Sequence, residues 1–154
     1  MRRVLCLISC SLLLNGCSTK SFTVPTASME PTIKAGSHVL VDTAYYTQNP
    51  VERFDLVVVK NPDGGAREFV RRVIGLGGET IQIQAGKILV NGKELKENFN
   101  FIPSQKDFGP ITIPQDQFFL LGDNRPGSFD SASWKQPTVG KNAVVGKVTK
   151  VVGK

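Results

Sequence analysis

Short runs of β-branched and aromatic residues, separated by turn residues, constrain the fold of this 154-residue chain most. Such runs favour extended strands, whereas clusters of glycine, proline and asparagine favour turns. The strands expected from this pattern cover residues 39–41, 56–59, 68–74, 80–84, 111–113, 118–121 and 143–152, with a hairpin over 87–95. No amphipathic helix of convincing length and no internal repeat interrupts them. The sequence therefore predicts a mainly β fold.

Turn residues mark how these strands are connected. Asn91-Gly92 lies between apolar flanks, which is the strongest short-range signal for a hairpin. Gly75, Gly77 and Gly78 predict a tight turn that needs positive φ or a close approach of the backbone. Residues 45–53 are expected to form a connection, and residues 96–110 an excursion over the surface.

The amino-terminal residues predict an exported protein. Arg2 and Arg3 precede an apolar run over residues 4–14, which is too short to span a bilayer and has the length of a signal-peptide core. Beyond residue 16 the chain carries 17 Lys and Arg against 13 Asp and Glu, a net charge of +4 without any dense block. This scattered excess suits an anionic surface better than a nucleic-acid groove, so no nucleic-acid partner is expected.

Residues 13–17 read Leu-Leu-Asn-Gly-Cys and resemble a bacterial lipobox, in which the cysteine is lipidated and becomes the mature amino terminus. Cys6 and Cys10 also lie before this junction, so the folded domain would contain no disulfide. Two or more acyl chains on Cys17 give stable anchoring. We therefore predict a signal peptide over 1–16, a lipid-anchored tether over 17–23 and a β domain over 24–154. A plain signal peptide or a short uncleaved anchor is the alternative.

Residues 24–32, Val-Pro-Thr-Ala-Ser-Met-Glu-Pro-Thr, place a serine in a stiff loop just before the β-rich region. Pro25 and Pro31 disfavour helix through this loop. Ser28 there could serve as a nucleophile, and the hydroxyl of Thr26 could stabilise an oxyanion. Proline, serine and threonine are also ordinary turn residues, so a purely structural loop is the alternative interpretation.

Four blocks, taken together and in order, resemble bacterial signal peptidase I, a family of membrane-bound serine endopeptidases that remove signal peptides. Residues 28–32 are similar to its nucleophile box, Ser-Met-x-Pro-Thr, and residues 54–60 to its Asp-containing β-branched strand. Residues 71–79 resemble the block Lys-Arg-Val-x-Gly-Leu-Pro-Gly-Asp, and residues 122–131 follow Gly-Asp-Asn-Arg-x-x-Ser-x-Asp-Ser. The resemblance covers residues 22–150 and implies a compact assembly of antiparallel strands.

The resemblance also implies roles for individual residues. Ser28 would attack the scissile carbonyl, and its own N–H together with the Thr26 hydroxyl would hold the oxyanion. Residues Phe22, Val24 and Pro25 would line shallow pockets that admit small residues such as alanine before the cleaved bond.

Further residues would support the catalytic base. In this family a lysine of lowered pKa takes the proton of the serine. Ser128 resembles the serine that orients this lysine, and Asp130 resembles the carboxylate that is paired with Arg72. No metal and no other cofactor is implied.

The chain departs from the family pattern at the base itself, where Arg71 replaces the lysine. A guanidinium is not deprotonated in proteins and cannot act as a general base. Arg71 could instead pair with Asp130 or Asp123 in a structural role. Ala132 and Gly77 are further departures, because the family usually has an arginine and a proline there. The candidates for a substitute base are His38, Lys60 and Lys34.

Two functions follow from the resemblance. The first is a membrane-anchored, signal-peptidase-like serine endopeptidase acting on preproteins or on a specialised exported precursor such as a pilin. The second is a non-catalytic relative that binds extended peptides by strand addition, which the Arg71 substitution favours. A self-cleaving regulator is disfavoured by the exported leader. Lipidated Cys17 would hold the protein to a membrane, facing the periplasmic side in a Gram-negative bacterium.

Overall fold

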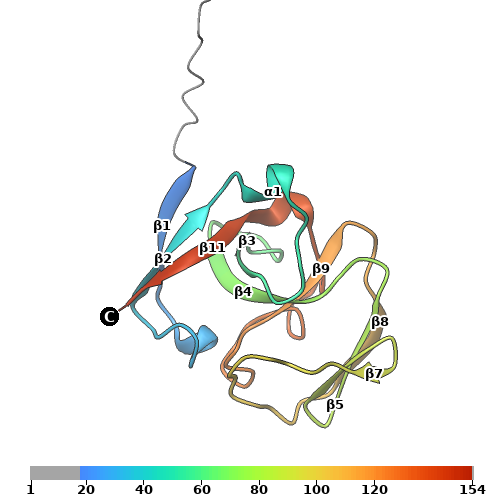
Figure 1. Cartoon of the computed structure of the whole chain (residues 1–154). Helices are drawn as coiled ribbons and strands as arrows, with labels where there is room; N and C mark the ends of the chain where they lie inside the picture. Colours follow the sequence, from blue (N-terminus) through green and yellow to red (C-terminus); the bar gives the residue numbers. More distant parts are fainter. Residues whose placement is uncertain (1–17, 154) are drawn as a thin grey trace, which may run out of the picture.

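The fold is known from a computed structural model that describes residues 18–153, so the expected signal peptide and Cys17 lie outside the described residues. Within this part, antiparallel strands form two sheets (Figure 1). The larger sheet contains, in spatial order, β1 (Thr19–Val24), β2 (Ser37–Asp42), β11 (Val144–Val152), β3 (Leu56–Lys60), β4 (Glu68–Gly75), β9 (Gln117–Leu121) and β10 (Val139–Gly140). The prediction of a mainly β, antiparallel fold is confirmed.

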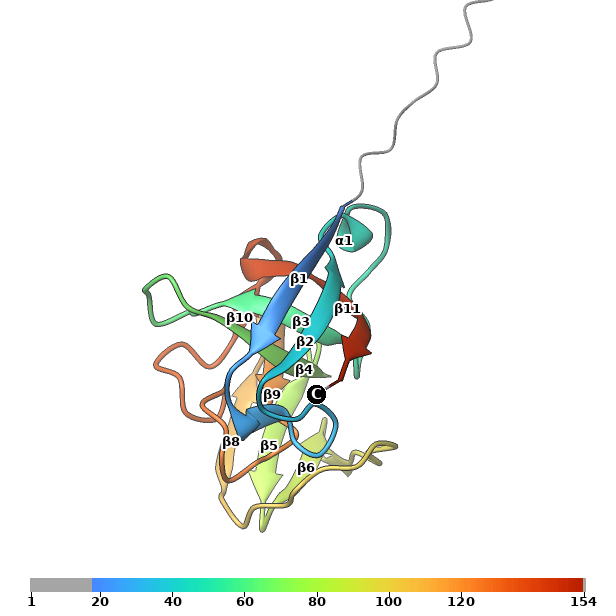
Figure 2. The same cartoon turned by 90° about the vertical axis from the view of Figure 1, so that its left-hand side faces the viewer.

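The smaller sheet is an excursion between β4 and β9. It contains, in spatial order, β7 (Lys93–Glu94), β6 (Lys87–Val90), β5 (Thr80–Gln84) and β8 (Phe108–Thr112). Figures 1 and 2 show this sheet at the opposite end of the molecule from β1 and β2. The predicted Asn91-Gly92 hairpin is confirmed, since both residues have the positive φ of a tight turn, 50° and 77°.

Helical structure in the described residues is limited to three short segments. These are a 3₁₀ turn η1 (Ala27–Met29), a helix α1 (Tyr45–Gln48) and a 3₁₀ turn η2 (Lys141–Ala143). The α1 turn lies inside the connection predicted over residues 45–53. Within residues 18–153 no helix has both the length and the apolar character needed to cross a membrane.

The tether predicted over residues 17–23 is wrong for Thr19–Thr23, which belong to β1. This strand pairs with β2 along its whole length, from Thr19 opposite Asp42 to Val24 opposite Ser37. In β1 only Phe22 and Val24 are apolar and turned inward. The alternation of apolar and polar residues was therefore too short to be recognised in the sequence. The folded domain therefore begins five residues earlier than predicted and leads directly into the Ser28 loop.

Apolar side chains anchor the segments around this loop. Met29 and Ile33 are fully buried in one cluster with inward-facing residues of the surrounding strands, namely Val24, Val39, Val41, Val58 and Val70. Burial of side chains of this size contributes about 1.5–3 kcal/mol each. The Ser28 loop is thus fixed to the sheet by the residue that follows the serine.

Candidate active site

Ser28 lies in η1, just beyond the end of β1, and only 4% of its surface is exposed. The loop that follows β9 holds it from the other side, because Asn124 donates its backbone N–H to the Ser28 carbonyl at 3.0 Å and its Nδ2 to Ala27 at 3.1 Å. Gly122 permits this approach: a Cβ there would lie 2.5 Å from the Ser28 carbonyl oxygen. Two predicted blocks far apart in sequence therefore meet at the serine.

Two hydrogen-bond donors meet at the Ser28 hydroxyl. The Thr26 Oγ1 donates to Ser28 Oγ at 3.1 Å, and Arg71 Nη1 donates to the same oxygen at 3.0 Å. The structure thus brings together Thr26, Ser28 and Arg71, which the sequence places in two separate blocks. No other side chain of residues 18–153 hydrogen-bonds to this oxygen.

Arg71 and Arg72 are consecutive in β4 and therefore point to opposite faces of the sheet. Arg72 forms a buried two-point ion pair with Asp123, with Nε–Oδ1 at 2.8 Å and Nη2–Oδ2 at 2.6 Å. Thr32 donates to the same carboxylate, which ties the end of the Ser28 loop to this pair. The expected pairing of Arg72 with Asp130 is wrong: the carboxylate in reach on that face belongs to Asp123.

Arg71 points toward the serine and is 3% exposed. Its Nε and Nη2 donate to the Phe129 carbonyl at 3.2 and 2.7 Å, and Nη1 also donates to the Val70 carbonyl at 2.6 Å. No carboxylate of the described residues lies within ion-pair distance of it, so the alternative in which Arg71 pairs with Asp130 or Asp123 is also wrong. The guanidinium is held by neutral carbonyls instead.

Burial lowers the pKa of Arg71 to about 10, and the charge of nearby Asp130 opposes this effect only in part. The side chain thus remains a cation at neutral pH. A cation at this position can donate hydrogen bonds to the serine but cannot remove its proton.

Asp130 lies behind the site. It is 3% exposed and accepts backbone N–H groups from Gly122 at 3.0 Å and Ala132 at 3.2 Å. Burial raises the pKa of its carboxyl, and the hydrogen bond from Gly122 counteracts this most. These bonds stabilise the loop that carries Phe129.

Ser128 lies beside the same loop, but it does not contact Arg71. Its Oγ is buried and has no partner at full hydrogen-bond geometry within residues 18–153, but it lies close enough to Asp130 to help lower the pKa of that carboxyl, which burial raises. Arg71 donates to the carbonyl of the next residue, Phe129, instead.

A groove of about 780 Å³ leads to the serine. Because the sheet curls, its walls come from both β1 and β4, although three strands lie between these two in the sheet order. Phe22, Val24 and Pro25 line one wall, as predicted for pocket residues, and residues 67–71 line the other. Its size is that of a ligand-binding cleft.

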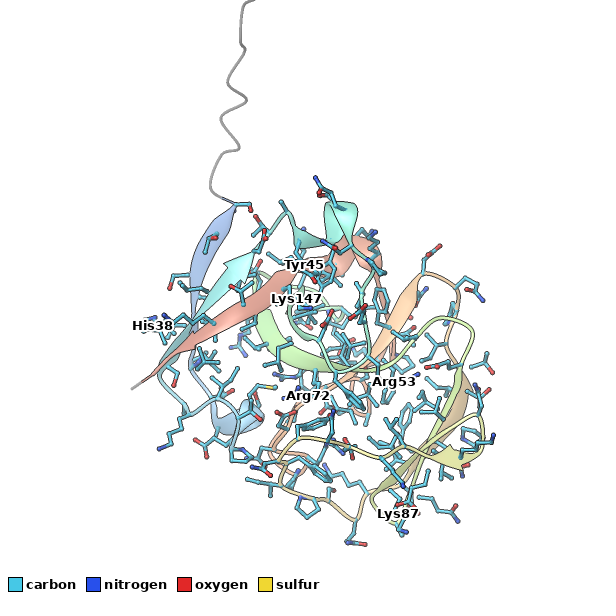
Figure 3. All side chains as sticks on the ribbon, in the orientation of Figure 1. His38, Tyr45, Arg53, Arg72, Lys87 and Lys147 are labelled. Carbon is cyan, nitrogen blue, oxygen red and sulfur yellow. The ribbon has the colours of Figure 1, made fainter. Side chains whose placement is uncertain are left out.

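The suggested alternative bases lie elsewhere. His38 is exposed on the rim of β2, where its Nδ1 is 3.2 Å from Thr23 Oγ1, and Figure 3 shows it at the margin of the molecule, well away from Arg72. Lys60 is exposed at the end of β3 opposite Glu68, and Lys34 is exposed in the turn before β2. None of the three hydrogen-bonds to Ser28 in the described structure.

Two contributors were missed from the sequence. Phe129 supplies the carbonyl that holds Arg71, and Asn124 fixes the backbone of the serine loop. Both lie inside the 122–131 block, so its density of polar and turn residues was the available signal. Phe129 acts through its own backbone carbonyl, and Asn124 binds the backbone carbonyls of the serine loop. Both roles therefore depend on the fold and not on a side-chain pattern.

Known proteins resemble this chain in sequence. The family model described as signal peptidase, peptidase S26, matches residues 1–152. Signal peptidase I of Leptolyngbya laminosa is 37% identical over 132 residues, which cover 79% of this chain and 65% of the relative. A probable signal peptidase I-2 of Synechocystis is 35% identical over 116 residues, covering 72% of this chain and 53% of the relative. The chain thus spans between half and two thirds of these relatives.

A solved structure is also similar. Signal peptidase I from Enterococcus faecalis superposes with a TM-score of 0.54 at 28% identity, covering 66% of this chain and 98% of that one. The likeness extends through the fold as well as the motifs.

Proposed function

This chain belongs to the signal peptidase family, peptidase S26, and on that premise we propose that it is a membrane-anchored serine endopeptidase. Its substrates would be signal peptides or one specialised exported precursor, bound as extended chains in the groove between β1 and β4. The observation that supports the proposal most is the position of Ser28. It lines this groove together with Thr26, and its Oγ is 3.1 Å from Thr26 Oγ1.

The proposed chemistry is acyl transfer. Ser28 Oγ attacks the scissile carbonyl, and the developing oxyanion is stabilised by the Ser28 N–H and the Thr26 hydroxyl. The peptide amine leaves with a proton, and water then hydrolyses the acyl ester to release a carboxylate. Both steps need a group that accepts and returns a proton. Because Arg71 stays charged, we propose slow turnover, with proton removal left to solvent.

Membrane anchoring is the finer part of the proposal. Lipidation of Cys17 would tether the chain two residues before β1, which spans about 20 Å at roughly 3.3 Å per residue. Because Ser28 lies just beyond the other end of β1, the site would then work close to the bilayer, on the side facing away from the cytoplasm. Preproteins that emerge from that membrane would be its substrates.

A second function, peptide binding without cleavage, is favoured by the hydrogen bond from Arg71 Nη1 to Ser28 Oγ at 3.0 Å. A cation that donates to the nucleophile occupies the place of the base. The groove, by contrast, is complete and could hold a peptide as an added strand.

Cleavage of a preprotein by the detergent-solubilised full chain separates the two functions. We expect slow cleavage by the wild type and none by Ser28→Ala, with peptide binding retained by both. Cleavage that persists in Ser28→Ala would reject the serine mechanism, and no cleavage by the wild type would leave the binding function.

A further inference from the structure

Arg71 carries a positive charge into the interior without an ion-pair partner among the described residues. It is 3% exposed, and it donates only to the carbonyl groups of Phe129 and Val70 and to the Ser28 hydroxyl. The Phe69 ring, whose centroid is 5.0 Å from the guanidinium carbon, and the more distant charge of Asp130 compensate it in part. A buried charge is costly unless it is paired and hydrogen-bonded. From this geometry we propose that the Ser28–Arg71 site binds the carboxylate at the carboxyl terminus of a peptide lying in the groove.

The donors needed for a carboxylate already converge at this point. Arg71 Nη1 is aimed at Ser28 Oγ, and the hydroxyls of Ser28 and Thr26 lie within 3.1 Å of one another. Of the five guanidinium N–H groups, four have acceptors within residues 18–153, and one on Nη2 does not. A carboxylate entering here would replace the serine oxygen as acceptor of Nη1 and take hydrogen bonds from both hydroxyls. Charge-assisted hydrogen bonds of this kind are about twice as strong as neutral ones.

The groove indicates that the carboxylate belongs to a peptide. From Glu68 at its far end to Arg71, β4 spans about 10 Å, which is the length of three extended residues. Between these ends the walls are mostly apolar, with Phe22, Val58 and Val70 among them. β1 and β4 both lead toward the serine end, so a peptide running parallel to them would place its last carboxylate at Arg71.

This inference rests on the proposed function only in taking the groove as the peptide site. It holds for an intact peptide that ends in a carboxylate. It also holds for the amino-terminal product of cleavage, whose new carboxylate forms at Ser28. Arg71 would thus retain the product that a neutral lysine would release more readily.

The test compares one fluorescent peptide ending in Ala-x-Ala as the free acid and as the carboxyl-terminal amide, by anisotropy, on the detergent-solubilised full chain. We expect the acid to bind at least about tenfold more tightly, as charged hydrogen bonds predict. Ser28→Ala should keep this preference, because it removes cleavage but leaves the guanidinium. Equal binding of acid and amide to the wild type would overturn the inference, whatever the cleavage assay shows.

Variants locate the effect. Arg71→Gln should remove the preference for the acid and Arg71→Lys should keep part of it. Lys60→Gln is the matched control, because Lys60 is exposed opposite Glu68 at the far end but does not line the groove, so the variant removes the same charge and should leave the preference intact. If Lys60→Gln removed it instead, general attraction would explain the result and the inference would fail. Displacement by acetate at the peptide's own concentration would likewise rule out recognition of a peptide.

Discussion

Arg71 Nη1 donates a hydrogen bond to Ser28 Oγ at 3.0 Å, across 43 residues of sequence. The Thr26 hydroxyl donates to the same oxygen, so Ser28 accepts two hydrogen bonds, and no described residue accepts its proton. A serine hydroxyl in this state lacks the base that would activate it as a nucleophile. Restoring a base should therefore reveal how complete the rest of the site is.

Arg71→Lys should create or greatly raise cleavage of a preprotein that contains Ala-x-Ala. A neutral lysine would accept the Ser28 proton, and general base catalysis contributes about 10²–10⁴-fold. Burial lowers the pKa of a lysine, and only its neutral form is active, so the rate should rise with pH through that lowered pKa. Initial rates between pH 6 and pH 10, at roughly one-unit steps, measure both effects.

Two controls accompany this variant. Ser28→Ala combined with Arg71→Lys should abolish the gain, and Arg67→Lys, on the groove rim, should give none. Native protein that cleaves as fast as Arg71→Lys would contradict the assignment of Arg71 as the blocked base.

Thr26→Val should slow cleavage by about 10²–10³-fold when it is measured together with Arg71→Lys, because one oxyanion donor is lost. Valine keeps the shape of threonine but has no hydroxyl to lie near Ser28 Oγ. Thr26→Ser keeps the hydroxyl and should restore most of the rate. An undiminished kcat in Thr26→Val would exclude this hydroxyl from the oxyanion site.

Much of the fold could be predicted because its strands are β-branched runs bounded by strong turn residues, as at Asn91-Gly92. β1 was missed because Phe22 and Val24 are the only apolar residues that alternate in it. The strand is stabilised by its pairing with β2, which its own sequence does not indicate. Motif order indicated Ser28 and Arg71, but the partner of Arg72 could not be predicted. Which carboxylate, Asp123 or Asp130, lies on the Arg72 face of β4 depends on how the loop after β9 folds.

Asp123→Asn should destabilise the protein by about 3–5 kcal/mol, because it leaves the charge of Arg72 buried and unpaired. The two side chains are only 8% and 1% exposed. Glu94→Gln is the matched control, since its pair with Lys87 is 55% and 64% exposed and should contribute less than about 1 kcal/mol. Urea unfolding of the three proteins measures the difference, and equal losses would contradict a special role for the buried pair.

Gly122→Ala should destabilise the protein by about 1–3 kcal/mol and weaken the site. The added Cβ would lie 2.2 Å from Ser128 Oγ and 2.5 Å from the Ser28 carbonyl oxygen, so the serine loop must shift. Gly153→Ala, where nothing lies within 4 Å, should be neutral. Thermal unfolding together with peptide binding tests this, and a Gly122→Ala protein with unchanged binding would show that the loops approach less closely than described.

The preference for a free carboxyl terminus should be lost at low pH. There the peptide carboxylate, with an ordinary pKa of about 3.3–3.7, becomes protonated and the acid binds like the amide. At neutral pH the preference should be complete, because Arg71 stays a cation: burial lowers its pKa only to about 10, and the charge of Asp130 behind the site opposes this effect. Anisotropy of the acid and amide peptides between roughly pH 2 and pH 8, at about one-unit steps, measures the loss. An acid preference that continues unchanged at about pH 2, well below the carboxyl pKa, would show that the carboxylate charge is not what Arg71 binds.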